Sequence, residues 1–214
     1  MKDIAIFGAG GLGRETVCFL NILNKEGADW NFIGFFDDGV EKGTQVSHFG
    51  KVLGGVNELN TWQEEIALII AIGNPLSVKK VRERINNKWV YFPNIIASSV
   101  EFTDEQTLSI GEGNIIGGNC CFTCNVHIGS FNLFNSGVVV GHDTVIGDYN
   151  IFMPDVRVSG EVTIGDTNLF GIASIVLQQL KVGNNIRLGA GSVLMTKPKE
   201  GNLYMGNPAK IFKY

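Results

Sequence analysis

A six-residue repeat dominates the second half of this chain. From Ile110 to Leu194 every sixth residue is apolar, which makes fifteen positions of fifteen. With about 45% apolar usage, a fixed frame gives this result by chance about once in 10⁵ sequences. The following residue is glycine in nine of the fifteen cases. A period of six fits neither the 3.6 residues of a helical turn nor the two-residue alternation of a strand, and it is typical of a β-helix.

The repeat predicts one short strand and one turn in every six residues. The repeated apolar residue points inward, and the small residue after it allows the chain to turn. Three strands close a triangular coil, so residues 110–199 predict about five stacked coils that lie about 4.8 Å apart. The repeat positions themselves build the scaffold, and functional residues are expected among those that depart from its pattern.

The first 90 residues follow a different pattern, in which short apolar runs alternate with helical periodicity. This order is typical of a βαβ-type α/β domain. The sequence therefore predicts a Rossmann-like α/β domain in residues 1–90 and an all-β parallel β-helix in residues 91–214. The expected strands cover 4–7, 32–36 and 66–72, and the expected helices cover 15–25 and 76–85.

Composition narrows the classes of partner. Lys and Arg number 17 against 21 Asp and Glu, a net charge of -4, so nucleic acid is not an expected partner. The apolar run at residues 4–7 is too short for a signal peptide or a membrane span. Three of the four cysteines fall within residues 120–124, which is no disulfide framework. We expect a cytoplasmic protein with reduced thiols.

A glycine cluster at residues 8–13 has the pattern G-x-G-x-x-G between an expected strand and an expected helix. In this setting bare backbone and helix N-terminal amides can bind a phosphate. Asp37 and Asp38 end the next strand, where a carboxylate can reach a ribose or a base. The domain is too short for two mononucleotide-binding halves, so a single nucleotide fits better than NAD. The alternative is a turn that only packs helix on strand.

His142 is the second feature that the repeat does not explain. It lies two residues after the inward Val140, at a turn, and Asp143 follows it. A neighbouring carboxylate can fix the tautomer of an imidazole and support it as a base. In an 18-residue coil, Cys124 and Gly160 stack on either side of His142. The alternative is a surface histidine with no role.

Two further patterns lie in the same region. Another turn column predicts a groove along the prism, because small side chains recur in it. Its members are Ser136, Pro154, Ile172 and Ala190. Cys121 and Cys124 form a C-x-x-C, but no second pair exists and a zinc site needs four ligands. We therefore predict no metal and interpret the cysteines as small packing residues.

Together these motifs resemble the acyltransferases of the left-handed β-helix, or hexapeptide-repeat, class. Within that class the chain is similar to bacterial sialic-acid O-acetyltransferases and nucleotide-amino-sugar N-acetyltransferases. The resemblance covers essentially the whole chain. Its motifs lie at residues 8–15, 36–38, 71–74, 141–148, 159–160, 189–194 and 206–210.

The resemblance implies a homotrimer that binds acetyl-CoA in a groove between two subunits. The general base falls on His142 and its supporting acid on Asp143. Some members carry a second histidine nine residues after the base, where this chain has Ile151. The CoA contacts, largely main chain, fall near Gly160, Ile172 and Ala190. The nucleotide-linked sugar is held by Gly10, Gly11, Leu12, Asp37, Asp38 and Gly73.

The expected reaction is direct acetyl transfer to the amino group of a nucleotide-linked 4-amino-4,6-dideoxy sugar, in bacterial surface polysaccharide or glycan biosynthesis. His142 takes the proton, and a backbone N–H, placed at Gly160, holds the oxyanion. The alternatives are O-acetylation of sialic acid or a related sugar, a covalent route through Cys124, an NAD-dependent oxidoreductase and a non-catalytic trimeric scaffold. The oxidoreductase is disfavoured because no Tyr has a Lys four residues later.

Overall fold

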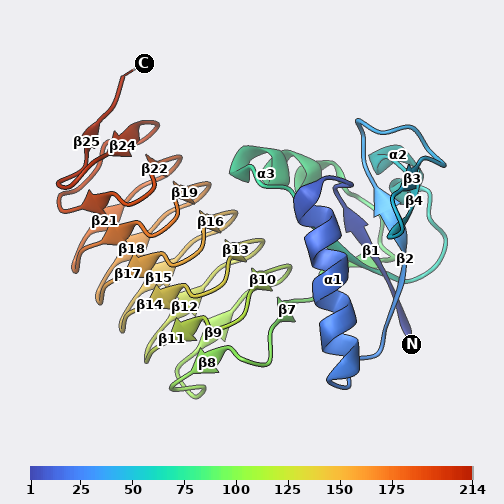
Figure 1. The fold of residues 1–214 in the computed structure, drawn as a ribbon, viewed down its shortest axis with the longest axis horizontal. Coiled ribbons are helices and arrows are strands. Elements are labelled where there is room, and N and C mark those ends of the chain that lie inside the picture. The colour runs from blue at the N-terminus through green and yellow to red at the C-terminus, as the bar shows by residue number, and fades with distance from the viewer. Residues whose placement is uncertain (214) are drawn as a thin grey trace. The chain divides into compact units, whose positions relative to one another are not determined.

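The computed structural model describes residues 1–213, which separate into two compact units with the division after residue 95. Figure 1 shows the first unit as helices around a sheet, in blue to green, and the second as a stack of short strands, in green to red. Within the described residues, no helix combines the length and the apolar character needed to cross a membrane.

A sheet with the strand order β3-β4-β2-β1-β5-β6 forms the centre of the first unit. All neighbours are parallel except β3 and β4. Its elements are β1 (Lys2–Phe7), α1 (Gly11–Lys25), β2 (Trp30–Phe36), β3 (Gln45–Val46), β4 (Gly50–Gly54), α2 (Val56–Asn60), β5 (Ile66–Ile70), α3 (Pro75–Arg84) and β6 (Val90–Tyr91).

Continuous apolar runs explain the centre of this sheet. All five residues of β5 are buried, as are residues 4–7 of β1, which is the pattern of parallel strands covered on both faces. α1 buries Val17 and Leu20, and it begins four residues before the predicted start because Gly10 serves as its N-cap. Sequence reasoning missed β3, β4, α2 and β6, which are short.

Three parallel sheets form the second unit, and the chain visits them in turn. The first sheet holds β7 (Ile95–Ile96), β10 (Ile115–Ile116), β13 (Leu133–Phe134), β16 (Ile151–Phe152), β19 (Leu169–Phe170), β22 (Arg187–Leu188) and β24 (Leu203–Met205), with β25 (Lys210–Ile211) antiparallel at its end. The second holds β8 (Glu101–Phe102), β11 (Cys121–Phe122), β14 (Val139–Val140), β17 (Arg157–Val158), β20 (Ile175–Val176) and β23 (Val193–Leu194). The third holds β9 (Ser109–Ile110), β12 (His127–Ile128), β15 (Val145–Ile146), β18 (Thr163–Ile164) and β21 (Lys181–Val182).

The predicted inward positions form the core of this prism. Of the fifteen, fourteen are buried and Ile110 is half-buried. The rings of Phe134, Phe152 and Phe170 stack one coil apart, with centroids 4.6 Å and 4.7 Å from one another. The predicted fold class, an α/β domain followed by a parallel β-helix, is confirmed.

The prism begins before the regular repeat does. Ser109 pairs with His127, 18 residues later, whereas Glu101 pairs with Cys121, 20 residues later. Two extra residues therefore lie between β8 and β9, and they shift the frame. For this reason the six-residue period alone could not reveal the strands β7 and β8.

The structure corrects the predicted turn. The residue with positive φ lies three positions after the inward residue, and non-glycine residues such as Asp143 (φ 55°) and Ala173 (φ 54°) occupy it. The glycine directly after the inward residue instead lets the backbone of the next coil approach closely. A Cβ on Gly141 would lie 2.6 Å from the backbone nitrogen of Gly160.

A ladder of buried asparagines ties successive coils together where the third sheet leads into the first. Each Oδ1 accepts a hydrogen bond from the backbone N–H of the residue 18 positions later, at 2.9, 2.8, 2.9 and 2.7 Å. The side-chain amides also bond along the column. The ladder consists of Asn114, Asn132, Asn150 and Asn168, and it ends on the N–H of Ile186.

We expect Asn150→Ala to lower the free energy of unfolding by about 2–4 kcal/mol, because it leaves the buried N–H of Asn168 without its acceptor and removes one of the two N–H donors to Asn132 Oδ1. The loss is measured as a shift of the urea midpoint, followed by circular dichroism. Gln178→Ala is the control, since that amide is exposed. Equal midpoints for the two variants would contradict the role of the ladder.

Candidate active site

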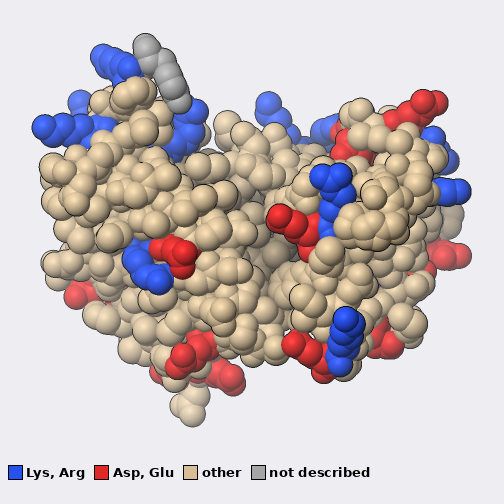
Figure 2. Space-filling model, in the orientation of Figure 1, with Lys and Arg blue, Asp and Glu red and all other residues tan. Residues whose placement is uncertain are grey.

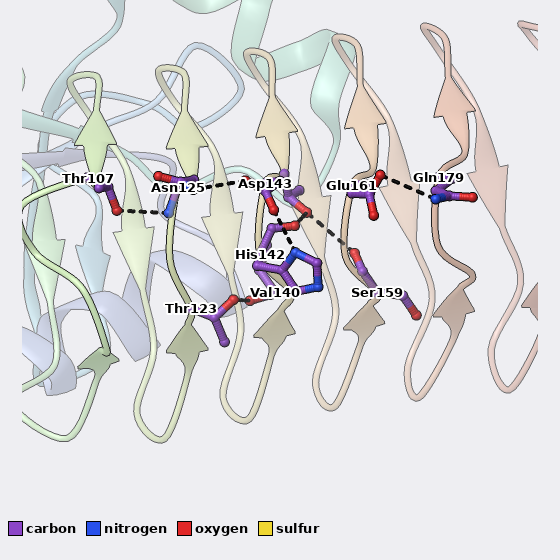
Figure 3. A network of polar contacts seen from close by, with 10 residues as sticks. Thr107, Thr123, Asn125, Val140, His142, Asp143, Ser159, Glu161 and Gln179 are labelled. Carbon is purple, nitrogen blue, oxygen red and sulfur yellow. Dashed lines mark hydrogen bonds and ion pairs between the residues drawn. The ribbon is translucent and has the colours of Figure 1, made fainter.

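The prism has three edges, and the predicted base lies on the one that joins the second sheet to the third. His142 and Asp143 form the corner between β14 and β15, and the imidazole Nδ1 lies 2.7 Å from Asp143 Oδ2 (Figure 3). Both side chains are about half exposed, at 54% and 49%. The sequence prediction that these neighbours interact is thus matched by a direct hydrogen bond.

This hydrogen bond settles which imidazole nitrogen is available. A carboxylate can only accept, so the neutral imidazole donates from Nδ1 and keeps its lone pair on Nε2. Two hydrogen bonds hold the pKa of the Asp143 carboxyl below its usual value. The one from His142 has the larger effect and the one from Asn125 the smaller. The arrangement therefore presents Nε2 as a proton acceptor beside an ionised carboxylate.

Gly160 makes room for the imidazole ring. A Cβ on Gly160 would lie 2.6 Å from His142 Nε2 and 2.7 Å from its Cε1. The backbone itself does not demand glycine here, because Gly160 has no positive φ and Gln178 occupies the same place one coil later. The ring is the reason for the glycine, and the stacking predicted from the 18-residue period is observed.

The position two residues after each inward residue lies on an edge of the prism. Its backbone N–H has a side-chain acceptor on one edge but not on the other two. On the edge between the third and first sheets, each N–H donates to a side chain of the next coil. These donors are Ser130, Asp148, Asp166 and Asn184, at 2.7, 2.9, 2.7 and 3.0 Å. Among the described residues, the N–H groups of Gly160, Ile172 and Ala190 have no such acceptor. They can serve as main-chain donors to a ligand.

The structure does not bring all the predicted prism residues together. Ile172 and Ala190 stack one coil apart on the edge between the first and second sheets, with Gly191 N donating to Ile172 O at 2.8 Å. Both are exposed. His142, Asp143 and Gly160 share the next edge, so a single chain carries the two groups on separate edges.

The glycine turn of the first unit divides into two kinds of glycine. Gly8 has φ +117°, and a Cβ there would lie 2.6 Å from Ala71 O; a Cβ on Gly13 would overlap Gly8 O. Folding alone explains these two. Nothing lies within 4 Å of the Cβ position of Gly10, Gly11 or Gly73. Their surroundings are open, as expected where a ligand approaches bare backbone.

The predicted sugar-binding residues meet at the carboxyl ends of parallel strands. The chain leaves β1 for β2 on one side and β5 lies on the other, which is the kind of switch point where ligands bind in α/β sheets. Gly10, Gly11 and Leu12 start α1 after β1, and Gly73 follows β5. The turn therefore has the geometry that the sequence predicts.

The paired acids differ in their contacts. Asp37 accepts from Ala9 N and Gly39 N, both at 2.8 Å, which ties it to the glycine turn. Asp38 accepts from Val56 N at 2.8 Å and pairs with Arg84 Nη1 at 2.5 Å. Asp38 thus links β2 to α2 and α3. A cavity of about 220 Å³ adjoins both acids and is also lined by Lys42 and Asn57.

The burial of the clustered cysteines agrees with the predicted packing role for Cys120 and Cys121 but not for Cys124. Cys120 is buried, and burial raises its pKa to about 11. Burial also raises the pKa of Cys121, while Cys124 is exposed, and its carbonyl accepts from Asp143 N at 3.0 Å. Among the described residues no three potential ligands gather around a metal position. Ile151, in place of a second histidine, is buried in β16.

Comparison with known proteins supports this architecture. Residues 3–89 match the family described as the PglD N-terminal domain. The chain is 31% identical over 146 residues to GDP-perosamine N-acetyltransferase of Escherichia coli O157:H7. That alignment covers 67% of this chain and 63% of the relative, so the chain spans less than two thirds of this curated protein.

Solved structures extend the similarity to the whole chain. WeeI from Acinetobacter baumannii AYE is 28% identical with a TM-score of 0.87, covering 99% of this chain and 100% of that one. The acetyltransferase domain of PglB from Neisseria gonorrhoeae FA1090, solved with acetyl coenzyme A, shares the fold at 24% identity, TM-score 0.86 and 99% coverage of both chains. The expected family resemblance and the Rossmann-like plus left-handed β-helix fold are confirmed.

We expect Gly160→Ala to displace the His142 ring and break its bond to Asp143, because the new Cβ would occupy the space under the imidazole. The exposed ring can swing outward, so the melting temperature should change by less than about 3 °C. A crystal structure of the variant, with the melting curve beside it, checks both points. An unmoved ring with an intact 2.7 Å hydrogen bond would refute the spacer role of Gly160.

Proposed function

The chain is similar in sequence and fold to sugar acetyltransferases of the hexapeptide-repeat class, and from this premise we propose that it transfers the acetyl group of acetyl-CoA to the amino group of a nucleotide-linked amino sugar. The observation that carries the proposal is the His142–Asp143 pair. Its Nε2 lies over Gly160, whose backbone N–H has no acceptor among the described residues. A base and an oxyanion donor then stand side by side.

The proposed chemistry is a direct transfer. The unprotonated sugar amine attacks the thioester carbonyl, forming the C–N bond while Nε2 of His142 removes a proton from the attacking nitrogen. The N–H of Gly160 donates to the oxyanion of the tetrahedral intermediate. The C–S bond then breaks, and the imidazolium gives this proton to the leaving thiolate of CoA. Asp143 stabilises that cation and does not itself change protonation.

We place acetyl-CoA along the edges that carry unpaired main-chain donors. Ile172 and Ala190 supply N–H groups that a carbonyl or phosphate of CoA can accept, and their small or exposed side chains leave room for it. His142 lies on another edge of the same chain. A groove between two subunits joins one edge of each, which supports a homotrimer. Acetyl-CoA is bound in the PglB relative.

We place the nucleotide-linked sugar in the Rossmann-like domain, residues 1–90, and acetyl transfer in the β-helix, residues 91–214. Gly10, Gly11 and Leu12 open the 15-residue helix α1, whose N-terminal amides favour a diphosphate. Asp37, Asp38 and Gly73 line the same strand ends and contact the nucleoside. The curated relative is named for GDP-perosamine, which supports a nucleotide-linked 4-amino-4,6-dideoxy sugar as the acceptor. We propose that the reaction serves bacterial surface polysaccharide or glycan biosynthesis in the cytoplasm.

Thiol release from acetyl-CoA tests the reaction. The panel holds GDP-, UDP- and dTDP-linked 4-amino-4,6-dideoxy sugars with free and CMP-linked sialic acid. We expect turnover with one amino sugar and a loss of about 10²–10⁴ in kcat for His142→Ala. The matched control is His127→Ala, which removes the other prism histidine, bonded to Ser109.

The outcomes separate the candidate reactions. Turnover with sialic acid alone would replace the amine by a hydroxyl as acceptor and make the enzyme an O-acetyltransferase. Equal rates for the His142→Ala and His127→Ala variants would refute His142 as the base. A protein that binds no acetyl-CoA and releases no thiol with any acceptor would contradict the proposed function as a whole.

Light scattering of the purified protein is expected to give the mass of three chains. The reason is that His142 on one edge and the N–H donors of Ile172 and Ala190 on another must meet across a subunit boundary to complete the site. A fully active monomer would contradict this assembly.

A further inference from the structure

We propose that Asn125 is a positioning residue that holds Asp143 in place for His142. The proposal rests on the proposed function for its consequence in catalysis, but its geometric part can be tested without turnover. Asn125 lies 18 residues before Asp143, at the same corner of the preceding coil, and its Nδ2 donates to Asp143 Oδ1 at 2.9 Å (Figure 3). The other carboxylate oxygen is left for the imidazole.

The two hydrogen bonds fix the carboxylate from both sides. Oδ1 is held by the amide of Asn125, and Oδ2 is held by His142 Nδ1. Asn125 is itself anchored, because its backbone N–H donates to Thr107 Oγ1 at 2.8 Å, one further coil away. A chain of contacts therefore runs along the corner through three coils and ends at the imidazole.

The next two residues of the column repeat this pairing of an acid with an amide. Glu161 follows Asp143 by 18 residues at the same corner, and the two carboxylates carry like charges. The side-chain amide of Gln179, one coil beyond, donates to Glu161 Oε2 at 3.3 Å. Each acid is thus bonded to an amide on the side away from the other acid. Figure 3 shows the two pairs along the column.

Loss of the amide would free the acid. Asp143 is about half exposed, and among the described residues Oδ1 has no hydrogen-bond partner except Asn125. Without that donor the carboxylate can leave its rotamer and gain conformational entropy in solvent. The imidazole would then lose its fixed acceptor at Nδ1, and the Nε2 lone pair would no longer be favoured over the other tautomer.

Backbone conformation offers a competing reason for asparagine at this place. Asn125 has φ 54°, a region that asparagine tolerates well. Asn185 has the same φ at another corner, and within residues 1–213 its side chain makes no hydrogen bond. Glycine accepts this φ without strain. Asn125→Gly therefore removes the amide alone, and Asn185→Gly is the matched control.

The first measurement uses NMR on the full chain with no substrate. The ¹⁵N shifts of the His142 ring report its tautomer, and the ¹³C shift of the Asp143 carboxyl reports its titration. We expect Asn125→Gly to reduce the Nδ1–H tautomer and to raise the pKa of Asp143, because the ionised carboxylate keeps only the hydrogen bond from His142; the nearest acid of the same corner, Glu161, lies one coil later and bonds to Gln179. Unchanged ring and carboxyl shifts in Asn125→Gly would overturn the proposal, whatever the activity.

The second measurement is kinetic. Asn125→Gly should lower kcat by about 10- to 100-fold and leave the KM for acetyl-CoA within about twofold, because binding groups are untouched. Asn125→Asp keeps the shape of the side chain but cannot donate to Asp143, so it should lose at least as much. If Asn125→Gly retains the kcat of Asn185→Gly, Asn125 has no role in the reaction. If the wild type shows no acetyl transfer, the proposed function fails and the ring and carboxyl shifts alone decide the placement of Asp143.

Discussion

The register of coil upon coil is the constraint on which the rest of the prism depends. From Ser109 to Val176 each strand pairs with the strand 18 residues later, so the neighbours of a residue in these coils lie 18 positions before and after it in the sequence. His142 faces Gly160 for this reason, and Asp143 meets Asn125 for the same reason. A one-residue shift would separate all four. The asparagine ladder opposes such a shift, because its buried amides bond only in this alignment.

The three edges of the prism differ in whether their backbone N–H groups stabilise the fold or are free to bind a ligand. The edge between the third and first sheets satisfies its backbone N–H groups with side chains from the next coil, Asp148 among them. The other two edges leave corresponding N–H groups without acceptors within the described residues. A backbone N–H without a protein acceptor costs little stability where water can bond to it. The same N–H contributes to binding when a ligand acceptor replaces that water. The same fold thus supplies a stabilising edge and two edges suited to a ligand.

The period alone predicted the prism, the inward positions and the stacking of His142 on Gly160, because these follow from counting. It could not predict that Asn125 bonds Asp143, since that contact depends on side-chain rotamers at two left-handed corners. It also missed β7 and β8, where two extra residues break the frame. In the first unit, the pairing of Asp38 with Arg84 joins residues 46 positions apart, and no local pattern encodes it.

The glycines of this chain have different structural reasons that the sequence pattern does not distinguish. Gly141 is required by the backbone of the next coil, Gly160 by an imidazole ring and Gly13 by the backbone carbonyl of Gly8 in the turn before α1. In the sequence the three are indistinguishable. Gly10 and Gly11 have open space where a Cβ would lie, so packing does not explain them. Glycines that the fold does not need are the ones that point to a ligand, and here they lie at the carboxyl end of the central strand β1.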